Sequence, residues 1–159
     1  MTTLEVGNQA PHFVSNDQNN KPFDSKTLMG KKWVLYFYPK DLTPGCTVQA
    51  CNLRDNYTKL QEEGIVIIGV SMDDANKHQK FIDKHKLPFP LMADIDKKLI
   101  LSYGVWGEKK FMGKVYDGIH RTTFVMDESS TIVGIIRKPK NKIHTEEIMK
   151  VYAESSERK

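Results

Sequence analysis

Two cysteines are the residues of this 159-residue chain best suited to chemistry, and they lie in one short stretch as Cys46-x4-Cys51. Thr43 is suited to cap a helix, and Pro44 suits the first helical position because its ring fixes φ. A helix that begins there places Cys46 at its third position, where the partial positive charge of the helix N-terminus stabilises a thiolate. Gly45 adds no side chain that would block access to the sulfur. The segment therefore predicts a reactive thiol at Cys46, with the Thr43 hydroxyl able to donate toward it.

The five-residue separation limits how the two cysteines can pair. On an intact α-helix their Cα atoms would be about 8–9 Å apart, whereas a disulfide joins Cα atoms about 4.4–6.8 Å apart. Either the two sulfurs never bond, or the first turns of the helix unwind when they do. Our hypothesis is the second: Cys46 is oxidised to a sulfenic acid, the start of the helix unwinds, and Cys51 condenses with it.

The same spacing argues against other uses of cysteine. Thioredoxin-type reductases use Cys-x-x-Cys, and a structural zinc site uses about four ligands. The five histidines show no ligand spacing and lie far from the cysteines in sequence: His12, His78, His85, His120 and His144. A permanent structural disulfide does not suit a reducing compartment, and closing so small a loop would stabilise the fold little.

Composition excludes several other classes of function. The formal net charge is +4, from 24 Lys and Arg against 20 Asp and Glu. The lysines are interleaved with acids rather than clustered, as a nucleic-acid surface requires. No apolar run approaches the roughly 20 residues that span a bilayer, and the N-terminus lacks the basic start and apolar stretch of a signal peptide. We therefore expect a cytoplasmic protein without a membrane or nucleic-acid partner.

The hydrophobic pattern predicts the elements that must hold the cysteines. Strands are predicted at four places: 33–38, 65–70, 122–126 and 131–137. Helices are also predicted at four: from Pro44 to Gly64, 75–85, 95–103 and 144–155. Thr145 is expected to cap the last helix, the turn-rich residues 15–22 predict a hairpin loop, and Pro88 begins an extended piece.

The order of these elements predicts an α/β fold. Strands that alternate with helices imply a central sheet covered on both faces. A β-α-β unit that feeds a hairpin and a last helix is the thioredoxin architecture, here a mixed β-sheet flanked by helices with an N-terminal extension. The chain has no repeat and no long linker, so we expect residues 1–159 to form a single thioredoxin-like domain. Cys46 would then lie between a strand end and a helix start, where such sheets place reactive groups.

A family resemblance strengthens this interpretation. The pattern Pro39-x-x-x-Thr43-x-x-Cys46 matches the active-site motif of the peroxiredoxins. The longer segment from Tyr36 to Asp55 resembles the peroxiredoxin Q group, also called bacterioferritin comigratory protein. The likeness continues through 103–114 and 118–124 and covers roughly residues 6 to 151. It implies a thiol peroxidase that reduces hydrogen peroxide and organic hydroperoxides, without metal, haem or flavin.

The resemblance also implies roles for five residues. Cys46 would be the peroxidatic cysteine, and Cys51 the resolving cysteine of the same chain. Arg121 would face the sulfur, although its own sequence context predicts an ordinary surface salt bridge. Thr43 and Pro39 would orient the peroxide and shield the site.

The same resemblance implies a local substitution and a set of partners. Gln49 stands where many relatives have Glu, and a neutral amide would leave Arg121 more cationic. Thioredoxin or a similar dithiol is the expected reductant, and a monomer is expected because the resolving cysteine is internal.

Two other functions stay open: a disulfide oxidoreductase, and a redox sensor or thiol chaperone without turnover. Three apolar residues are expected to pack in the core rather than line an entrance: Trp106, Phe111 and Met112.

Overall fold

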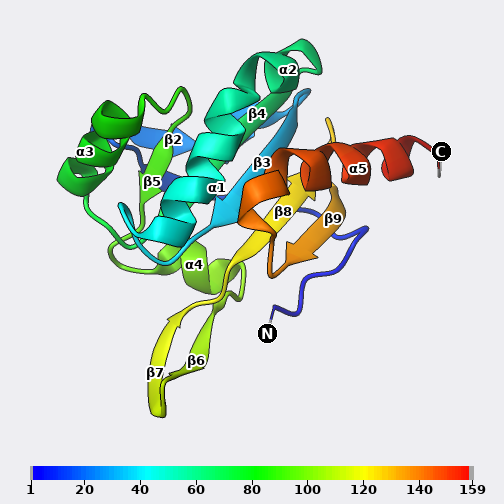
Figure 1. The fold of residues 1–159 in the computed structure, drawn as a ribbon. Coiled ribbons are helices and arrows are strands. Elements are labelled where there is room, and N and C mark those ends of the chain that lie inside the picture. The colour runs from blue at the N-terminus through cyan, green and yellow to red at the C-terminus, as the bar shows by residue number, and fades with distance from the viewer. Residues whose placement is uncertain (1, 158–159) are drawn as a thin grey trace.

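A computed structural model describes residues 2–157, and its centre is a five-stranded mixed sheet (Figure 1). In spatial order the strands are β5 (Leu91–Ala93), β4 (Ile65–Ser71), β3 (Lys32–Phe37), β8 (Thr122–Met126) and β9 (Ile132–Arg137). β3, β4 and β5 are parallel, while β8 pairs antiparallel with both β3 and β9. The four predicted strands are confirmed to within one residue at each end.

Both faces of the sheet are covered, which explains the continuous apolar runs in β3 and β4. Side chains alternate across β3, so Val34 and Tyr36 lie in one core cluster and Leu35 and Phe37 in the other. In register, Trp33 pairs with Val66 of β4 across the parallel ladder.

Helices pack on the two faces. The cluster with Tyr36 receives buried side chains from α1 (Pro44–Asp55), α2 (Tyr57–Glu62), α3 (Ala75–His85) and α5 (His144–Glu157). The other cluster is covered by α4 (Lys98–Ser102), the 3-10 turn η1 (Ser25–Leu28) and the N-terminal segment. The predicted α/β sheet with helices on both faces is confirmed. Within residues 2–157, no helix has the length and apolar character needed to cross a bilayer.

Two hairpins lie outside the central sheet. β1 (Val14–Asn16) pairs with β2 (Pro22–Asp24), which confirms the hairpin loop predicted at 15–22. The second hairpin, β6 (Trp106–Phe111) with β7 (Lys114–Ile119), was not predicted because its strands are largely exposed and show no apolar alternation. Figure 1 shows it projecting from the body of the protein.

The position of that hairpin tests the prediction that Trp106, Phe111 and Met112 pack in the core. Phe111 and Met112 are 65% and 87% exposed, so the expectation of core packing is wrong for both. Trp106 is half-buried and packs against the core cluster that contains Phe37, as expected. The difference arises because Met112 is in the turn of the hairpin, at a φ of 51°, far from the sheet.

Three helix predictions needed correction. The helix predicted at 95–103 is shorter at both ends and spans Lys98–Ser102. The helix expected from Pro44 to Gly64 is broken at Asn56, whose side-chain Nδ2 donates to the Asn52 carbonyl at 2.8 Å. This side chain competes with the backbone for the carbonyl and ends the first helix. Thr145 does not cap α5; it is the second residue of that helix, and its hydroxyl donates to Asn52 Oδ1 at 2.8 Å.

Candidate active site

The start of α1 has the predicted geometry. Thr43 is the N-cap with extended backbone angles (φ −80°, ψ 154°), Pro44 is the first helical residue, and Cys46 is the third. The first helical hydrogen bond runs from the Thr47 N–H to the Thr43 carbonyl at 2.9 Å. The N–H groups of Gly45 and Cys46 therefore have no partner within the helix, and both lie at its N-terminus, where the helix dipole favours negative charge.

Arg121 lies against the sulfur. It follows β7 in the chain, and its Nη2 donates to Cys46 Sγ at 2.8 Å, while its Nη1 donates to Gln49 Oε1 at 2.9 Å. Gln49 comes one helical turn after Cys46, on the same buried face of α1. The surface salt bridge that sequence context predicted for Arg121 is therefore wrong, and its guanidinium places a positive charge on a thiol that is only 1% exposed. Such a charge stabilises the thiolate form.

Lys109 of β6 brings a second cation to the same region, which the sequence did not reveal. Its Nζ donates to the Ile119 carbonyl at 2.9 Å. Burial, followed by the charge of Arg121, lowers the pKa of Lys109, while Cys46 opposes this shift. The site therefore concentrates positive charge around one sulfur.

Gly45 lets Arg121 approach the helix. A Cβ atom at Gly45 would lie 3.0 Å from Arg121 Nη2 and 3.2 Å from Asn141 Nδ2. Replacing Gly45 with Ala should move the guanidinium by a few tenths of an ångström and slow oxidation of Cys46 by peroxide about tenfold. The thermal midpoint should change little, because the better helix propensity of Ala offsets the crowding. Stopped-flow kinetics and thermal unfolding of the same samples would measure both effects.

Thr47→Ala is the matched control for this prediction, since it also raises the helix propensity of α1 but adds no atom beside Arg121. An unchanged peroxide rate in Gly45→Ala would show that the guanidinium tolerates displacement.

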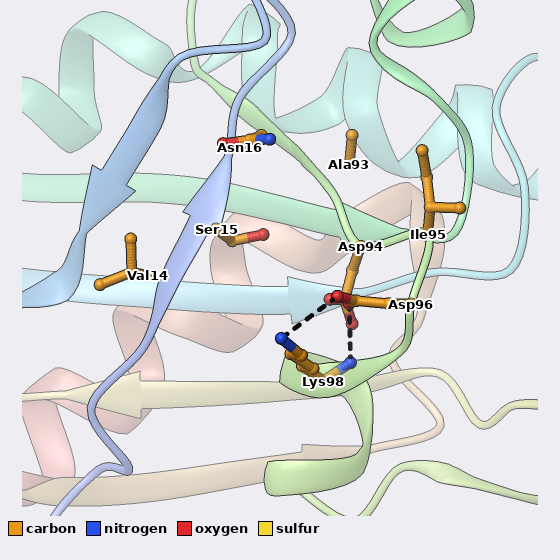
Figure 2. A pocket seen from close by; sticks show the side chains of 8 residues that line it. All are labelled: Val14, Ser15, Asn16, Ala93, Asp94, Ile95, Asp96 and Lys98. Carbon is orange, nitrogen blue, oxygen red and sulfur yellow. Dashed lines mark hydrogen bonds and ion pairs between the residues drawn. The ribbon is translucent and has the colours of Figure 1, made fainter.

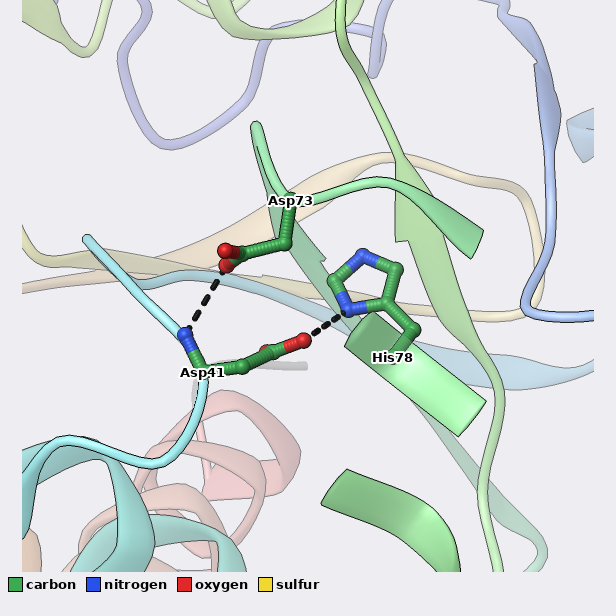
Figure 3. A group of neighbouring side chains, drawn as sticks. All are labelled: Asp41, Asp73 and His78. Carbon is green, nitrogen blue, oxygen red and sulfur yellow. Dashed lines mark hydrogen bonds and ion pairs between the residues drawn. The ribbon is translucent and has the colours of Figure 1, made fainter. Parts of the chain in front are cut away.

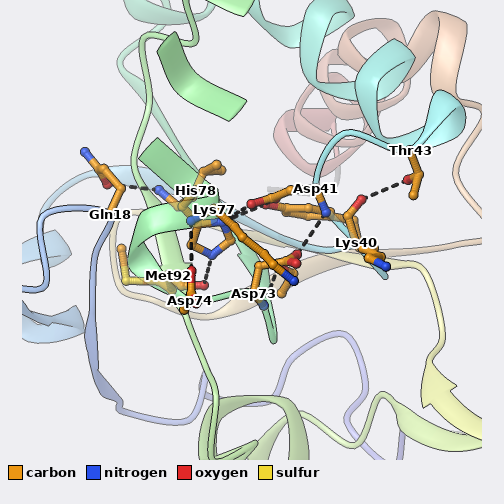
Figure 4. A network of polar contacts seen from close by, with 12 residues as sticks. Gln18, Lys40, Asp41, Thr43, Asp73, Asp74, Lys77, His78 and Met92 are labelled. Carbon is orange, nitrogen blue, oxygen red and sulfur yellow. Dashed lines mark hydrogen bonds and ion pairs between the residues drawn. The ribbon is translucent and has the colours of Figure 1, made fainter. Parts of the chain in front are cut away.

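Thr43 and Pro39 lie close to this centre along the chain. The Thr43 hydroxyl donates to the Lys40 carbonyl at 2.8 Å (Figure 4), so in this structure it does not donate toward the sulfur as expected. Pro39 is half-buried and follows directly on Tyr38 after the end of β3. The structure thus brings Cys46, Arg121 and Gln49 into contact, with Thr43 and Pro39 in the preceding loop.

Cys51 shares the same unbroken helix. Both cysteines are free, and Cys51 is half-buried, with its Sγ 3.8 Å from Nδ1 of His85. Because α1 is continuous from Pro44 to Asp55, the helical separation deduced from the sequence applies. A bond between Cys46 and Cys51 requires part of this helix to unwind.

A buried polar network holds the loop that leads into α1, and the sequence did not reveal it. His78 Nδ1 lies 2.6 Å from Asp41 Oδ2, and His78 Nε2 lies 2.8 Å from the Met92 carbonyl (Figures 3 and 4). The Asp41 N–H donates to Asp73 Oδ2 at 2.8 Å, and Tyr38 Oη donates to Asp41. The side chains of Asp41, Asp73 and His78 lie close enough together to hold a metal ion. Each is already bonded to protein groups, so the cluster is explained as a hydrogen-bond network.

Replacing His78 with Leu should destabilise the protein by about 3 kcal/mol or more, because Oδ2 of the buried Asp41 carboxylate would lose its partner. Urea unfolding at neutral pH measures this loss. The exposed pair of His12 and Asp24, 2.7 Å apart, provides the control, and His12→Leu should leave the unfolding midpoint unchanged. Equal effects of the two substitutions would contradict the prediction.

Two cavities border the contact between Gly45 and Arg121. One, of about 450 Å³, is lined by Lys109, His120, Arg121, Thr122, Arg137, Lys138 and Pro139. The other, of about 470 Å³, is lined by Pro44, Gly45, Val48, Lys140, Asn141 and Lys142. A third cavity of about 320 Å³ lies apart from the cysteines, between β1 and the residues that follow β5 (Figure 2). Its buried carboxylate, Asp94, already accepts from the N–H groups of Leu99 and Ile100 at the start of α4.

Comparison with known proteins agrees with this geometry. A sequence profile described as the AhpC/TSA family matches residues 6–135. The chain belongs to the AhpC/TSA family. It is 48% identical to the putative peroxiredoxin bcp of Haemophilus influenzae over 149 residues, covering 94% of this chain and 96% of that protein. It is 41% identical to peroxiredoxin Bcp of Escherichia coli, with the same coverage.

The fold comparison points to the same group. The solved structure of peroxiredoxin Q from Xanthomonas campestris superposes with a TM-score of 0.84 at 29% identity, covering 97% of this chain and 98% of that one. The thioredoxin-like fold and the resemblance to the peroxiredoxin Q group are therefore confirmed. These relatives support thiol peroxidase activity for this peroxiredoxin.

Proposed function

We propose that this peroxiredoxin reduces hydrogen peroxide and organic hydroperoxides through a sulfenic acid on Cys46 and a disulfide between Cys46 and Cys51. The observation that carries the proposal is the Arg121 guanidinium, which donates to a buried Cys46 sulfur at the N-terminus of a helix that also bears Cys51. One helix thus carries both sulfurs, and a fixed positive charge from another part of the chain lies against the first of them.

In the first step the Cys46 thiolate attacks one peroxide oxygen, and the other oxygen leaves as an anion that takes up a proton. The Cys46 N–H and Arg121 are suited to spread the developing negative charge. Thr43 and Pro39 would orient the peroxide and shield it from water.

Unsatisfied polar groups gather at the same place. Among residues 2–157, three buried side-chain atoms have no hydrogen-bond partner: Tyr36 Oη, Gln49 Nε2 and Asn141 Oδ1. Gln49 contacts Arg121, Asn141 borders Gly45, and Tyr36 belongs to the core cluster of Cys46. Buried polar groups without partners are costly, so their clustering at one site favours a polar substrate there.

In the second step Cys51 attacks the sulfenic sulfur, a disulfide forms, and water leaves. The C-terminal half of α1 is held to the rest of the protein: Asn52 bonds Thr145 and the Lys142 carbonyl, and Arg54 bonds the His85 carbonyl. We therefore propose that the first turns, with Cys46, unwind toward a stationary Cys51.

The substrate and the reductant follow from chemistry and from relatives. The bacterioferritin comigratory protein of Xanthomonas campestris, 28% identical with a TM-score of 0.84, is described by its alkyl peroxide reduction activity. We propose the same substrate class here, with either cavity beside Gly45 and Arg121 as the approach. Thioredoxin, or a similar dithiol, would reduce the disulfide. The enzyme would act in the cytoplasm. It would act as a monomer, because the resolving cysteine lies in the same chain.

Mass spectrometry and circular dichroism test this cycle together. One equivalent of hydrogen peroxide should convert the reduced protein into a monomer with a 46–51 disulfide, and the helical signal should fall as the first turns unwind. Added thioredoxin, its reductase and NADPH should then support repeated peroxide consumption. A disulfide between two chains would refute the internal resolving cysteine, and a proven 46–51 disulfide with an unchanged spectrum would refute the unwinding.

A further inference from the structure

Cys51 faces a histidine from a different helix. His85 is the last residue of α3, and its Nδ1 lies 3.8 Å from Cys51 Sγ. We propose that His85 is the general base of the resolving step, taking the proton from the Cys51 thiol as this sulfur attacks oxidised Cys46. This inference rests on the proposed function and assigns a catalytic residue that the family motif does not contain.

Ring packing and a backbone contact fix the position of His85. Its ring packs edge-on against Phe81, with centroids 5.6 Å apart and an interplanar angle of 83°. The backbone carbonyl of His85 accepts from Arg54 Nη1 of α1 at 2.7 Å. Three residues after Cys51, Arg54 therefore ties the helix that carries the thiol to the end of the helix that carries the base.

The local charges favour a neutral, proton-accepting ring. Partial burial lowers the pKa of His85, and the charges of Lys84 on α3 and Arg54 on α1 lower it further. A neutral imidazole therefore predominates at pH 7, and Nδ1 can accept the thiol proton. The distance is long for transfer, but sulfur is a large atom, and such contacts tighten when the reacting partner arrives.

The step balances without another reactant. Cys51 Sγ bonds to Cys46 Sγ, the S–O bond of the sulfenic acid breaks, and the oxygen leaves as hydroxide, which becomes water on taking a proton. The proton of the Cys51 thiol passes to His85 Nδ1, and the imidazolium then returns it to the leaving hydroxide or to solvent. The products are one disulfide, one water and the neutral base.

The position of His85 also agrees with the proposed unwinding of the first turns of α1 toward a stationary Cys51. If α1 unwinds from its N-terminus, Cys51 and Arg54 keep their contacts with α3 while Cys46 approaches. The thiol thus stays beside its base until the sulfurs bond. His85 contacts the resolving cysteine, whereas the side chain that contacts the Cys46 sulfur is Arg121.

Two variants separate this role from a structural one. His85→Asn retains an acceptor near the Nδ1 position but cannot hold the proton, whereas His85→Ala leaves room for added imidazole. Both should react with hydrogen peroxide within twofold of the wild-type rate, yet form the 46–51 disulfide at least tenfold more slowly at pH 7. The deficit of His85→Asn should shrink as pH rises to 9, because hydroxide can then take the thiol proton, and imidazole should restore the rate of His85→Ala.

The measurement is rapid-quench trapping of free thiols with mass spectrometry, from pH 6 to 9. A disulfide rate in His85→Asn within twofold of wild type at every pH would overturn the proposal, as would His85→Ala that imidazole does not rescue. Absence of the 46–51 disulfide in the wild-type protein would instead refute the proposed cycle, so the two failures are distinct.

Discussion

Replacing Cys46 with Ser should abolish peroxide consumption, because a serine hydroxyl at this position cannot supply the thiolate that attacks the peroxide oxygen. The loss should be complete within the background of the assay, since the only other thiol, Cys51, lies away from Arg121 on the same helix. The side chains are nearly isosteric, so the unfolding midpoint should change little. Coupled oxidation of NADPH through thioredoxin reductase and thioredoxin measures the turnover.

Cys51→Ser is the matched variant for this test. It should consume one equivalent of peroxide, leave Cys46 as a sulfenic acid that dimedone traps, and then fail to be recycled by thioredoxin. Retained turnover in Cys46→Ser would refute the assignment of the peroxidatic cysteine. A wild-type protein that is oxidised once and never recycled would favour a redox sensor over a peroxidase.

Replacing Arg121 with Gln should slow the oxidation of Cys46 by about 10² to 10³-fold, equivalent to about 2.7–4 kcal/mol of transition-state stabilisation. The guanidinium donates directly to Cys46 Sγ, so its loss removes both a charge that favours the thiolate and a donor to the leaving oxygen. The glutamine amide cannot replace the bidentate donation to Cys46 and Gln49. Stopped-flow measurement of single-turnover oxidation by hydrogen peroxide gives the rate.

Arg137→Gln controls for the general loss of positive charge. Arg137 lines the same basic cavity as Arg121 but is exposed, so its removal should leave the single-turnover rate within twofold. If both variants kept the wild-type rate within twofold, the direct contact with the sulfur would have no catalytic role. Equal large losses in both variants would indicate that the cavity attracts the substrate by its charge.

The local features of this peroxiredoxin could be predicted because they depend on neighbours in the chain. Thr43 and Pro44 start a helix by their own backbone preferences, and that start places Cys46 at the third helical position. The buried strands at β3 and β4 follow from continuous apolar runs, and the separation of Cys46 and Cys51 follows from helical geometry alone. The break at Asn56 was missed because the hydrogen bond from its side chain to the Asn52 carbonyl leaves no periodic pattern in the sequence. The exposed β6–β7 hairpin was missed because its strands lack apolar alternation.

Contacts between distant residues were decided by the tertiary structure. The parallel pairing of β4 with both β3 and β5 brings the carboxyl ends of these strands to one edge of the sheet, where Asp41, Asp73 and His78 meet. The connection after β7 carries Arg121 to Cys46 across 75 residues, and the end of α3 carries His85 to Cys51 across 34. Spacing along the chain predicts the reactive sulfur and its partner, but the side chains that contact them come from other elements. Their positions depend on the packing of the sheet, because no local preference of Arg121 or His85 specifies a sulfur as its neighbour.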